Sequence, residues 1–354
     1  MKSNGDSMLS GPQAWPAEGL EEIRHCPVCS SIERDCLYTG LTDRVFRRAQ
    51  GQWDVYQCNS CRTAYLDPRP TPATISMAYQ AYYTHKPALE GRTEDLTFMQ
   101  RQAVMLANGY RNWRFGGNLE PASRAGGMLI RQLPLFRQFL DRELRFLPPL
   151  KPGARLLDVG FGSGAFLMLA QQIGWQVSGV DTDPVTVENA REAGLDVRQG
   201  GIEAFDDSRE EFDVIAMNHV IEHVHDPVET LNQAYAGLKS GGVLYVETPN
   251  IDAYGHHRFK EHWRGLEIPR HLVLFNWQSI TELLKKTGFK KCSSIPIAWS
   301  YASMAAKSRA IRNGRDPYLS AGPTLLDRLI ATRLFYFLFK SYQESEFITL
   351  IAHK

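Results

Sequence analysis

The segment 156–181 constrains the fold of this chain more than any other part of its sequence. A strand-like apolar run ends at Val159, a G-x-G-x-G turn follows at once from Gly160 to Gly164, and helix-period sequence comes next. A chain that passes directly from a strand into a helix needs backbone angles that glycine tolerates, and the missing Cβ atoms let a ligand approach the main chain. The second strand ends at Asp181, where a carboxylate can accept hydrogen bonds from both hydroxyls of a ribose. The segment therefore predicts two parallel strands with a nucleotide-like ligand at their carboxyl ends.

The spacing of the glycines separates the candidate ligands. The dinucleotide fingerprint is G-x-G-x-x-G, whereas here the third glycine follows the first after four residues and Ala165 occupies the fingerprint position. Asp158 opens the turn and is an acid available to the methionine end of S-adenosylmethionine (SAM). The spacing favours SAM over NAD, and a plain tight turn is the structural alternative. The predicted cofactor-binding residues are Asp158, Gly160, Gly162, Gly164, Asp181, Ile202 and Asn218.

Residues 151 to about 292 alternate short apolar runs with amphipathic segments, which is the rhythm of βαβ units around a parallel sheet. A further strand closes the chain at 346–352. The other predicted strands are Arg155–Val159, Gln176–Val180, Asp196–Gln199, Asp213–Met217 and Val243–Glu247.

With these residues the stretch 151–292 resembles the class I SAM-dependent methyltransferases, in particular the branch of the ubiquinone-biosynthesis O-methyltransferases. The resemblance implies an α/β Rossmann-like sheet of seven strands in the order 3-2-1-4-5-7-6, with strand 7 antiparallel. It also implies that SAM lies across the tips of strands 1 and 2 and that the loop 200–203 holds adenine. Gly201 stands where the family often has Asp, so the usual contact with adenine N6 cannot be carried over. The backbone N–H of Ile202 is the expected donor to adenine N1.

The loop after the fourth predicted strand, Asn218–Pro227, resembles the H-V-x-E-H-V-x-D-P stretch of the same branch, which lies beside the reacting methyl group. His219, Glu222 and His223 are spaced i, i+3, i+4, so on one helical turn they would share a face. One hypothesis makes His219 or His223 a general base that Glu222 orients. In a second, the positions hold Mg²⁺ as in some relatives, although His219 replaces the first Glu and is a softer ligand. In a third they cap a helix and satisfy buried backbone groups.

A second block, Trp263–Phe275, resembles a W-x-G-x-x-x-P-R-H-x-x-x-F stretch of the branch. Arg264 or Arg270 is a candidate clamp for an anionic acceptor, and His271 is a further candidate base. The structural alternative is that these residues anchor a loop. The predicted catalytic set is therefore His219, Glu222, His223 and His271.

Two C-x-x-C pairs, Cys26/Cys29 and Cys58/Cys61, are separated by 28 residues. This is the spacing class of a zinc ribbon, in which two knuckles offer four thiolates to one tetrahedral ion. The gap is longer than usual, so a loop such as 39–51 must extend outwards. Four thiolates close the site, which predicts a structural zinc that stabilises a small module. An iron–sulfur centre and free thiols are the alternatives, and Cys36 and Cys292 are taken as incidental.

These patterns divide the chain into a disordered lead (1–22), a zinc ribbon (23–66), a linker and helical cap (67–150), and a SAM-binding methyltransferase domain with a helical insertion near 299–342 (151–354). After its Pro-rich start, the stretch 67–150 continues in helix-period sequence rich in Arg, Leu and Phe, such as Leu129–Leu147. Asp67–Pro70 and the tyrosines Tyr79, Tyr82 and Tyr83 match bacterial methyltransferases that carry such a ribbon, where the tyrosines would form a lid or pack in the core. The apolar segment Leu325–Phe339 is expected to wall an acceptor site, lie on a membrane or pack on the core.

The near-neutral charge of the chain limits the kinds of binding partner that the sequence predicts. Forty Lys and Arg face 39 Asp and Glu, which disfavours an extended nucleic-acid interface. No apolar run is long enough to span a membrane, and paired cysteines without a disulfide pattern favour the cytoplasm. The predicted activity is methyl transfer to a small-molecule hydroxyl. Alternatives are an rRNA or tRNA methyltransferase, against which the lack of an N-P-P-Y motif also counts, a sugar C-methyltransferase, and a non-catalytic SAM-binding module.

Overall fold

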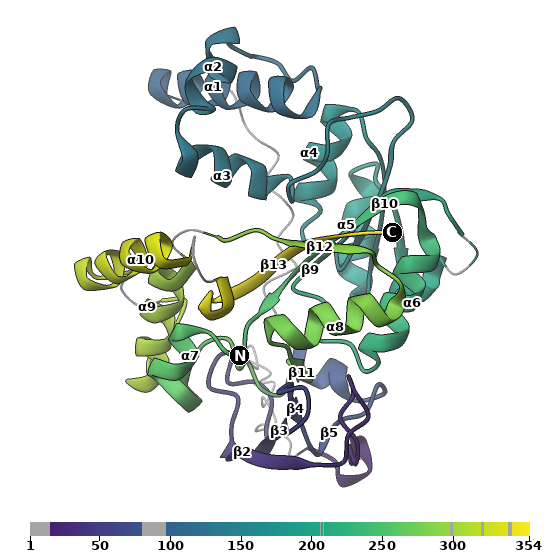
Figure 1. The fold of residues 1–354 in the computed structure, drawn as a ribbon, viewed down its shortest axis with the longest axis vertical. Coiled ribbons are helices and arrows are strands. Elements are labelled where there is room, and N and C mark those ends of the chain that lie inside the picture. The colour runs from purple at the N-terminus through teal and green to yellow at the C-terminus, as the bar shows by residue number, and fades with distance from the viewer. Residues whose placement is uncertain are drawn as a thin grey trace, which may run out of the picture.

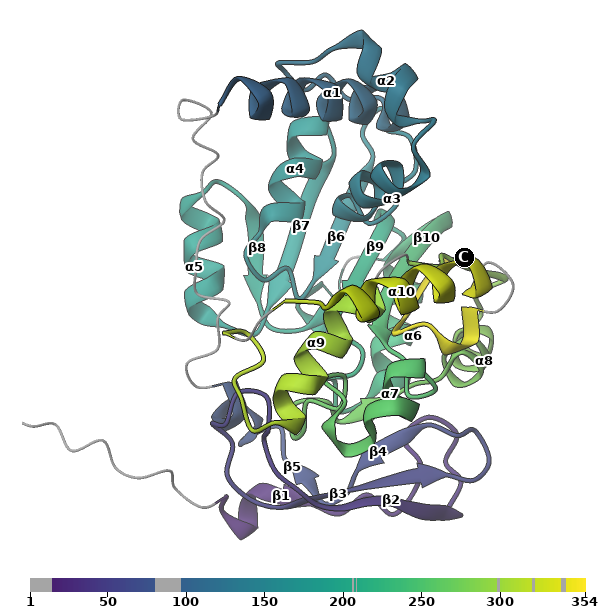
Figure 2. The ribbon, with the colours of Figure 1, turned by 90° about the vertical axis from the view of Figure 1, so that its left-hand side faces the viewer.

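The computed structural model describes residues 15–79, 97–205, 207, 209–297, 300–319, 322–338 and 342–354. A large central sheet lies between a helical cap at one end and a smaller cysteine-bearing sheet at the other (Figures 1 and 2).

The central sheet has seven strands in the spatial order β12-β13-β10-β9-β6-β7-β8. Numbered along the domain, this order is 3-2-1-4-5-7-6 when it is read from β8. The last strand, β13, is antiparallel to both of its neighbours, β10 and β12. The remaining neighbouring pairs, β10–β9, β9–β6, β6–β7 and β7–β8, are parallel. The predicted Rossmann-like methyltransferase sheet is therefore confirmed. The strands are β6 (Arg155–Val159), β7 (Gln176–Asp181), β8 (Asp196–Gln199), β9 (Phe212–Asn218), β10 (Leu238–Pro249), β12 (Lys291–Ser294) and β13 (Phe347–His353).

Helices cover both faces of this sheet because neighbouring residues of its strands point to opposite sides. Leu156 and Val214 pack in one core with α4 (Ala165–Ile173) and α5 (Pro184–Glu192). Leu157, Ile215 and Met217 pack in another with α6 (Pro227–Gly237) and α8 (Trp277–Thr287). Burial on both sides explains why these strands are nearly continuous apolar runs.

The helical cap consists of α1 (Phe98–Phe115), α2 (Arg124–Ile130) and α3 (Pro134–Glu143). The helix-period sequence at 129–147 contains the end of α2 and the whole of α3, with a break between them because Leu133 has non-helical backbone angles and Pro134 starts a new helix. Glycines let α1 approach the segment that leads into α2. A Cβ added at Gly109 would lie 1.8 Å from the Ser123 carbonyl oxygen.

The cysteine-bearing sheet joins two regions that are distant in sequence. Its order is β11-β4-β3-β2, and β11 comes from the block between β10 and β12 of the central sheet. Residues 15–22, which were expected to be disordered, include a 3₁₀ helix and the short strand β1, paired with β5. The strands are β1 (Leu20–Glu21), β2 (Arg34–Leu41), β3 (Trp53–Cys58), β4 (Ala64–Leu66), β5 (Arg69–Pro70) and β11 (Val273–Leu274).

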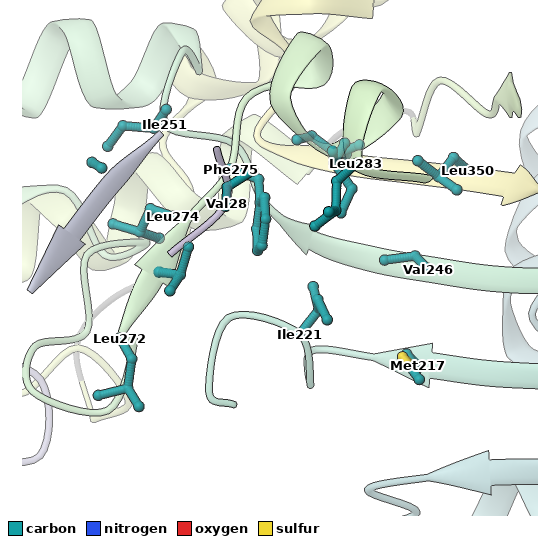
Figure 3. Close-up of a cluster of buried hydrophobic side chains, with 14 of the residues drawn as sticks. Val28, Met217, Ile221, Val246, Ile251, Leu272, Leu274, Phe275, Leu283 and Leu350 are labelled. Atoms are coloured by element: carbon teal, nitrogen blue, oxygen red, sulfur yellow. The ribbon is translucent and has the colours of Figure 1, made fainter. Parts of the chain in front are cut away.

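One hydrophobic core runs through the cysteine-bearing sheet and the central sheet. Val28 of the first knuckle lies in a cluster with Leu274 and Phe275, and the same cluster continues to Val246 and Leu350 (Figure 3). The two sheets are therefore expected to stabilise each other.

The C-terminal helices are α7 (Tyr254–Phe259), α9 (Ser300–Arg312) and α10 (Leu325–Leu338). α10 packs on α9, where Arg309 forms an ion pair with the buried Asp327. Ala331 is buried while Leu325, Leu326 and Leu329 are exposed, and Phe339 lies outside the described residues. Within the described ranges, no helix combines the length and apolar character needed to cross a membrane. Short 3₁₀ helices occur at Ala17–Gly19, Ile75–Tyr79, Ile202–Phe205, Lys260–His262 and Tyr342–Glu344.

Candidate active site

A cleft of about 1390 Å³ opens at the carboxyl ends of β6, β7, β9 and β10. This is where open α/β sheets bind ligands. Most of the predicted cofactor-binding residues line it: Gly160, Gly162, Asp181, Ile202 and Asn218. His219 and His223 line the same cleft, as does Tyr79 from the segment after the cysteine-bearing sheet.

The glycine turn has the backbone that its sequence predicts. Gly160, Gly162 and Gly164 have φ angles of +67°, +57° and +73°, in the left-handed region. The Gly160 N–H donates to the Val180 carbonyl oxygen, and the Gly162 N–H donates to Asp181 Oδ2 at 2.9 Å. Asp181 therefore fixes the turn as well as lining the cleft, and burial raises the pKa of its carboxyl group.

Alanine at Gly162 is expected to weaken binding of S-adenosylhomocysteine and to lower the free energy of unfolding by about 1 kcal/mol. A Cβ at this cleft-lining glycine meets no protein atom within 4 Å, so it would occupy open space. Gly153→Ala is a matched control, because Gly153 has φ +71°, equally open surroundings and no place in the cleft lining. Both variants should lose similar stability in chemical unfolding. An equal loss of ligand affinity in calorimetric titrations of the two would contradict the assignment of the turn.

Two of the predicted cofactor-binding residues, Asp158 and Gly164, do not line the cleft. Asp158 is fully buried, and Arg145 forms an ion pair with one of its carboxylate oxygens. Burial raises the pKa of Asp158 to about 6 despite the guanidinium. Arg145 itself lines the cleft, so it is the guanidinium rather than the acid that faces a ligand there. Gly164 caps the start of α4 and does not belong to the cleft lining.

His219 lies between two buried acids. Its Nδ1 is 3.2 Å from Glu222 Oε1, and its Nε2 is 3.5 Å from Glu247 Oε1. Burial alone would lower the pKa of His219, but hydrogen bonds to the two carboxylates and their charges outweigh it and raise the pKa to about 9. His219 is thus a cation near neutral pH, a state in which it cannot accept a proton.

The protonated His219 is expected to make stability fall as the pH rises. Its pKa is about 6.5 when unfolded and about 9 when folded, so its contribution is complete below pH ~6.5 and is lost as the pH passes through about 9. Urea unfolding of the wild type and of His219→Gln between pH 6 and 10 measures the difference. The two free energies should converge toward the alkaline end, and a constant difference would refute the paired cation.

His223 and His271 form a second cluster on the other side of Glu222. Their rings meet edge to face with centroids 4.7 Å apart, and ligand atoms of both lie within 4.8 Å of a Glu222 carboxylate oxygen. His223 Nδ1 is 3.0 Å from the Arg270 carbonyl oxygen, and His271 Nδ1 is 2.8 Å from the Gly265 carbonyl oxygen. Since a carbonyl can only accept, both Nδ1 atoms carry protons, and Nε2 is the basic nitrogen of each ring.

Only one of these two histidines reaches the cleft lining. His271 is buried, and burial lowers its pKa to about 4, so the ring stays neutral. His223 faces the cleft, and Tyr79 Oη lies 2.9 Å from its Nδ1. The shared face expected for residues 219–223 is wrong, because the segment forms turns rather than a helix and the two histidines contact different partners. The side chain of Glu222 also accepts from Thr248 Oγ1.

Glu247 and Arg142 are site residues that the sequence reasoning missed. Glu247 near the end of β10 accepts from Arg142, Tyr245 and Thr349 and lies beside His219. Its carboxylate lines the cleft, and the neighbouring cations hold its pKa well below the usual range despite burial. Glu247 could have been identified from the sequence, because it is an acid at the end of an apolar predicted strand. No feature of the neighbouring sequence distinguishes Arg142 as a site residue.

Arg264 and Arg270, the candidate clamps, are both engaged with protein groups. Arg270 is fully buried and pairs with Asp43 at 2.9 Å, which ties the loop 42–52 to the block 263–275. Arg264 pairs with Glu267 and donates to Tyr318 Oη. Neither belongs to the cleft lining, so the anchoring alternative describes their placement.

The four knuckle cysteines converge at one point. The Sγ atoms of Cys26 and Cys61 are 3.6 Å apart, those of Cys29 and Cys58 are 3.5 Å apart, and all four lie within 4.8 Å of one another. A tetrahedral zinc with Zn–S bonds of about 2.3 Å sets its sulfurs about 3.8 Å apart, so this donor set fits the ion. Cys36 is exposed on β2, away from the cluster.

Comparisons with known proteins agree with this geometry. A family model described as "Methyltransferase domain" matches residues 131–294. The ubiquinone biosynthesis O-methyltransferase of Ruegeria sp. is 35% identical over 116 residues, which cover 31% of this chain and 47% of the relative. The enzyme of the same name from Azorhizobium caulinodans is 38% identical over 122 residues, covering 33% and 47%. The chain thus spans about half the length of the curated relatives it matches.

Solved structures that match part of the chain include a SAM-dependent methyltransferase from Archaeoglobus fulgidus, with a TM-score of 0.41, 20% identity and coverage of 66% of this chain and 95% of that one. Another is phosphoethanolamine N-methyltransferase 2 of Haemonchus contortus, with a TM-score of 0.44, 18% identity and coverage of 82% and 62%. Residues 131–294 match the methyltransferase domain model, and they supply six of the seven strands of the Rossmann-like sheet.

Proposed function

We propose that this protein transfers the methyl group of SAM to a hydroxyl group of a small molecule, such as a hydroxylated aromatic ring. One observation carries the proposal: the glycine turn with Asp181 and the basic residue His223 line the same cleft. The names of the curated relatives, which are O-methyltransferases, support a hydroxyl acceptor.

The described residues supply complementary groups for each part of SAM. Asp181 would accept from the ribose hydroxyls, and the backbone at Ile202 would face adenine. Arg142 and Arg145 line the cleft and would attract the carboxylate of the methionine moiety. Bound SAM supplies an already activated methyl group, so the protein has to align the acceptor and exclude water.

His223 is the residue proposed to remove the acceptor proton. Its Nδ1–H is oriented by the Arg270 carbonyl, which leaves Nε2 free to accept. Glu222 lies close enough to stabilise the imidazolium that forms, and the neutral His271 adds no opposing charge. His219 and Glu222 act as positioning residues, because their charges are already compensated by each other and by Glu247.

Zinc is proposed as a structural ion held by Cys26, Cys29, Cys58 and Cys61. Four thiolates leave no position open for a substrate. The Asn276 side chain donates to the Cys61 carbonyl oxygen, and β4 pairs with β11, so the metal module would brace the block that carries His271.

Ligand binding and product formation together test the activity. The purified protein should bind S-adenosylhomocysteine, and Asp181→Ala should weaken that binding by about 10- to 100-fold through loss of charge-assisted hydrogen bonds. Asp35→Ala, an exposed acid on β2, is the matched control. Incubation with SAM and catechol or 3,4-dihydroxybenzoate should yield an O-methylated product. Normal affinity in the Asp181 variant, or transfer to amines but not to hydroxyls, would overturn the proposal.

A further inference from the structure

The corner between α2 and α3 carries large apolar side chains that point to solvent. Six residues between 128 and 139 are at least a third exposed, and Phe136 and Phe139 reach 64% and 62%. Exposure of single apolar residues is ordinary, but a contiguous group indicates an interaction site. We call this group the α2–α3 face: Met128, Leu129, Leu133, Leu135, Phe136 and Phe139.

The charged side chains of the segment that carries this face are all positive. Residues 121–140 contain three arginines and no Asp or Glu. Arg131 and Arg137 are exposed and alternate in sequence with the apolar residues of the face. Glu120, directly before this segment, is an exposed acid whose carboxylate accepts from the Ala122 N–H. The acids that follow the segment are engaged with other groups: Asp141 is buried against Tyr110, and Glu143 pairs with Arg111.

The face lies at the helical end of the molecule, far from the cysteine-bearing sheet (Figures 1 and 2). The chain leads from this face to the cleft, because Arg142 at the end of α3 and Arg145 just beyond it line that cavity. Nothing in the described part of the chain covers these side chains.

From this arrangement we infer that the α2–α3 face binds the surface of an anionic lipid bilayer. Phenylalanine and leucine side chains enter the interface between headgroups and acyl chains, while arginines between them meet the lipid phosphates. A fluid bilayer does not require shape complementarity, so it can accommodate side chains that project from the corner between two helices. The face would hold the cleft mouth beside the membrane. This inference rests on exposure and charge and does not depend on the proposed reaction.

Vesicle sedimentation tests the inference with the full chain. Wild type should bind vesicles of phosphatidylcholine and phosphatidylglycerol (~7:3) at least about tenfold more tightly than phosphatidylcholine alone, and raising the salt should weaken this. Phe136→Ser/Phe139→Ser should reduce binding to the mixed vesicles at least tenfold. Arg131→Gln/Arg137→Gln should reduce binding to mixed vesicles and not to the neutral ones.

The matched control is Phe98→Ser/Met99→Ser, which removes two equally exposed apolar side chains at the start of α1. It should bind the mixed vesicles as the wild type does. Equal loss in both double variants would overturn the assignment to α2–α3, as would the absence of any wild-type binding. Light scattering after gel filtration measures the oligomeric state. If the wild type is a dimer and Phe136→Ser/Phe139→Ser is a monomer, the face is a protein interface and the membrane inference is wrong.

Discussion

Replacing His223 by alanine is expected to lower kcat for transfer to a catechol hydroxyl by about 10²- to 10⁴-fold, the usual contribution of a general base. The reason is that the basic Nε2 of His223 lies at the cleft and, unlike the ring nitrogens of His219, is not committed to a carboxylate. Affinity for S-adenosylhomocysteine should stay within a factor of two or three, because the proposed cofactor contacts come from the glycine turn and Asp181 and not from His223. The measurements are steady-state product formation and calorimetric titration.

Two comparisons separate this chemical role from a structural one. Added imidazole should restore part of the activity of His223→Ala, since it can enter the space left by the ring. His257→Gln, which removes an exposed histidine on α7, should keep wild-type kcat. If His223→Ala retained kcat, or lost cofactor affinity and stability together without rescue, the base assignment would be wrong.

The sheet was predictable because its signals are local. The central strands bury both faces, so apolar runs such as Arg155–Val159 and Asp213–Met217 mark their own limits. The glycine turn was equally predictable, since left-handed backbone angles at three positions need glycine. Pro134 is also a local signal, because proline favours the first turn of a helix and marks the start of α3.

The electrostatics of the site could not be predicted from spacing alone. The intervals among His219, Glu222 and His223 suggested one shared face, but the charge of His219 depends on Glu247, which lies 28 residues further on. The same limit applies to Arg270, whose partner Asp43 belongs to a loop far away in sequence. Both outcomes depend on tertiary contacts that bring distant charges together in a buried place.

The cysteine cluster and the proposed active site are connected through main-chain hydrogen bonds. The Leu66 N–H donates to the Leu272 carbonyl oxygen, and the Leu272 N–H donates to the Glu222 carbonyl oxygen. The hydrogen bond from Asn276 to Cys61 provides a second connection. Loss of the metal would therefore affect the segment that holds Glu222 and His271, besides destabilising the cysteine-bearing sheet, which shares its core with the central sheet.

Cys58→Ser is accordingly expected to abolish stoichiometric zinc and to cost more than about 5 kcal/mol of the free energy of unfolding, since binding of a structural zinc contributes directly to folding. Such a loss is comparable with the whole stability of many domains, so chelation of the wild type provides a parallel measurement that needs no folded variant. The zinc content, the unfolding temperature and the affinity for S-adenosylhomocysteine should then decline together and recover when zinc is returned. Metal analysis, thermal unfolding and calorimetric titration measure them. Cys36→Ser, on the exposed side of β2, should change stability by less than about 0.5 kcal/mol. A protein that keeps its unfolding temperature and ligand affinity after complete removal of the metal would show that the four thiols do not need the ion.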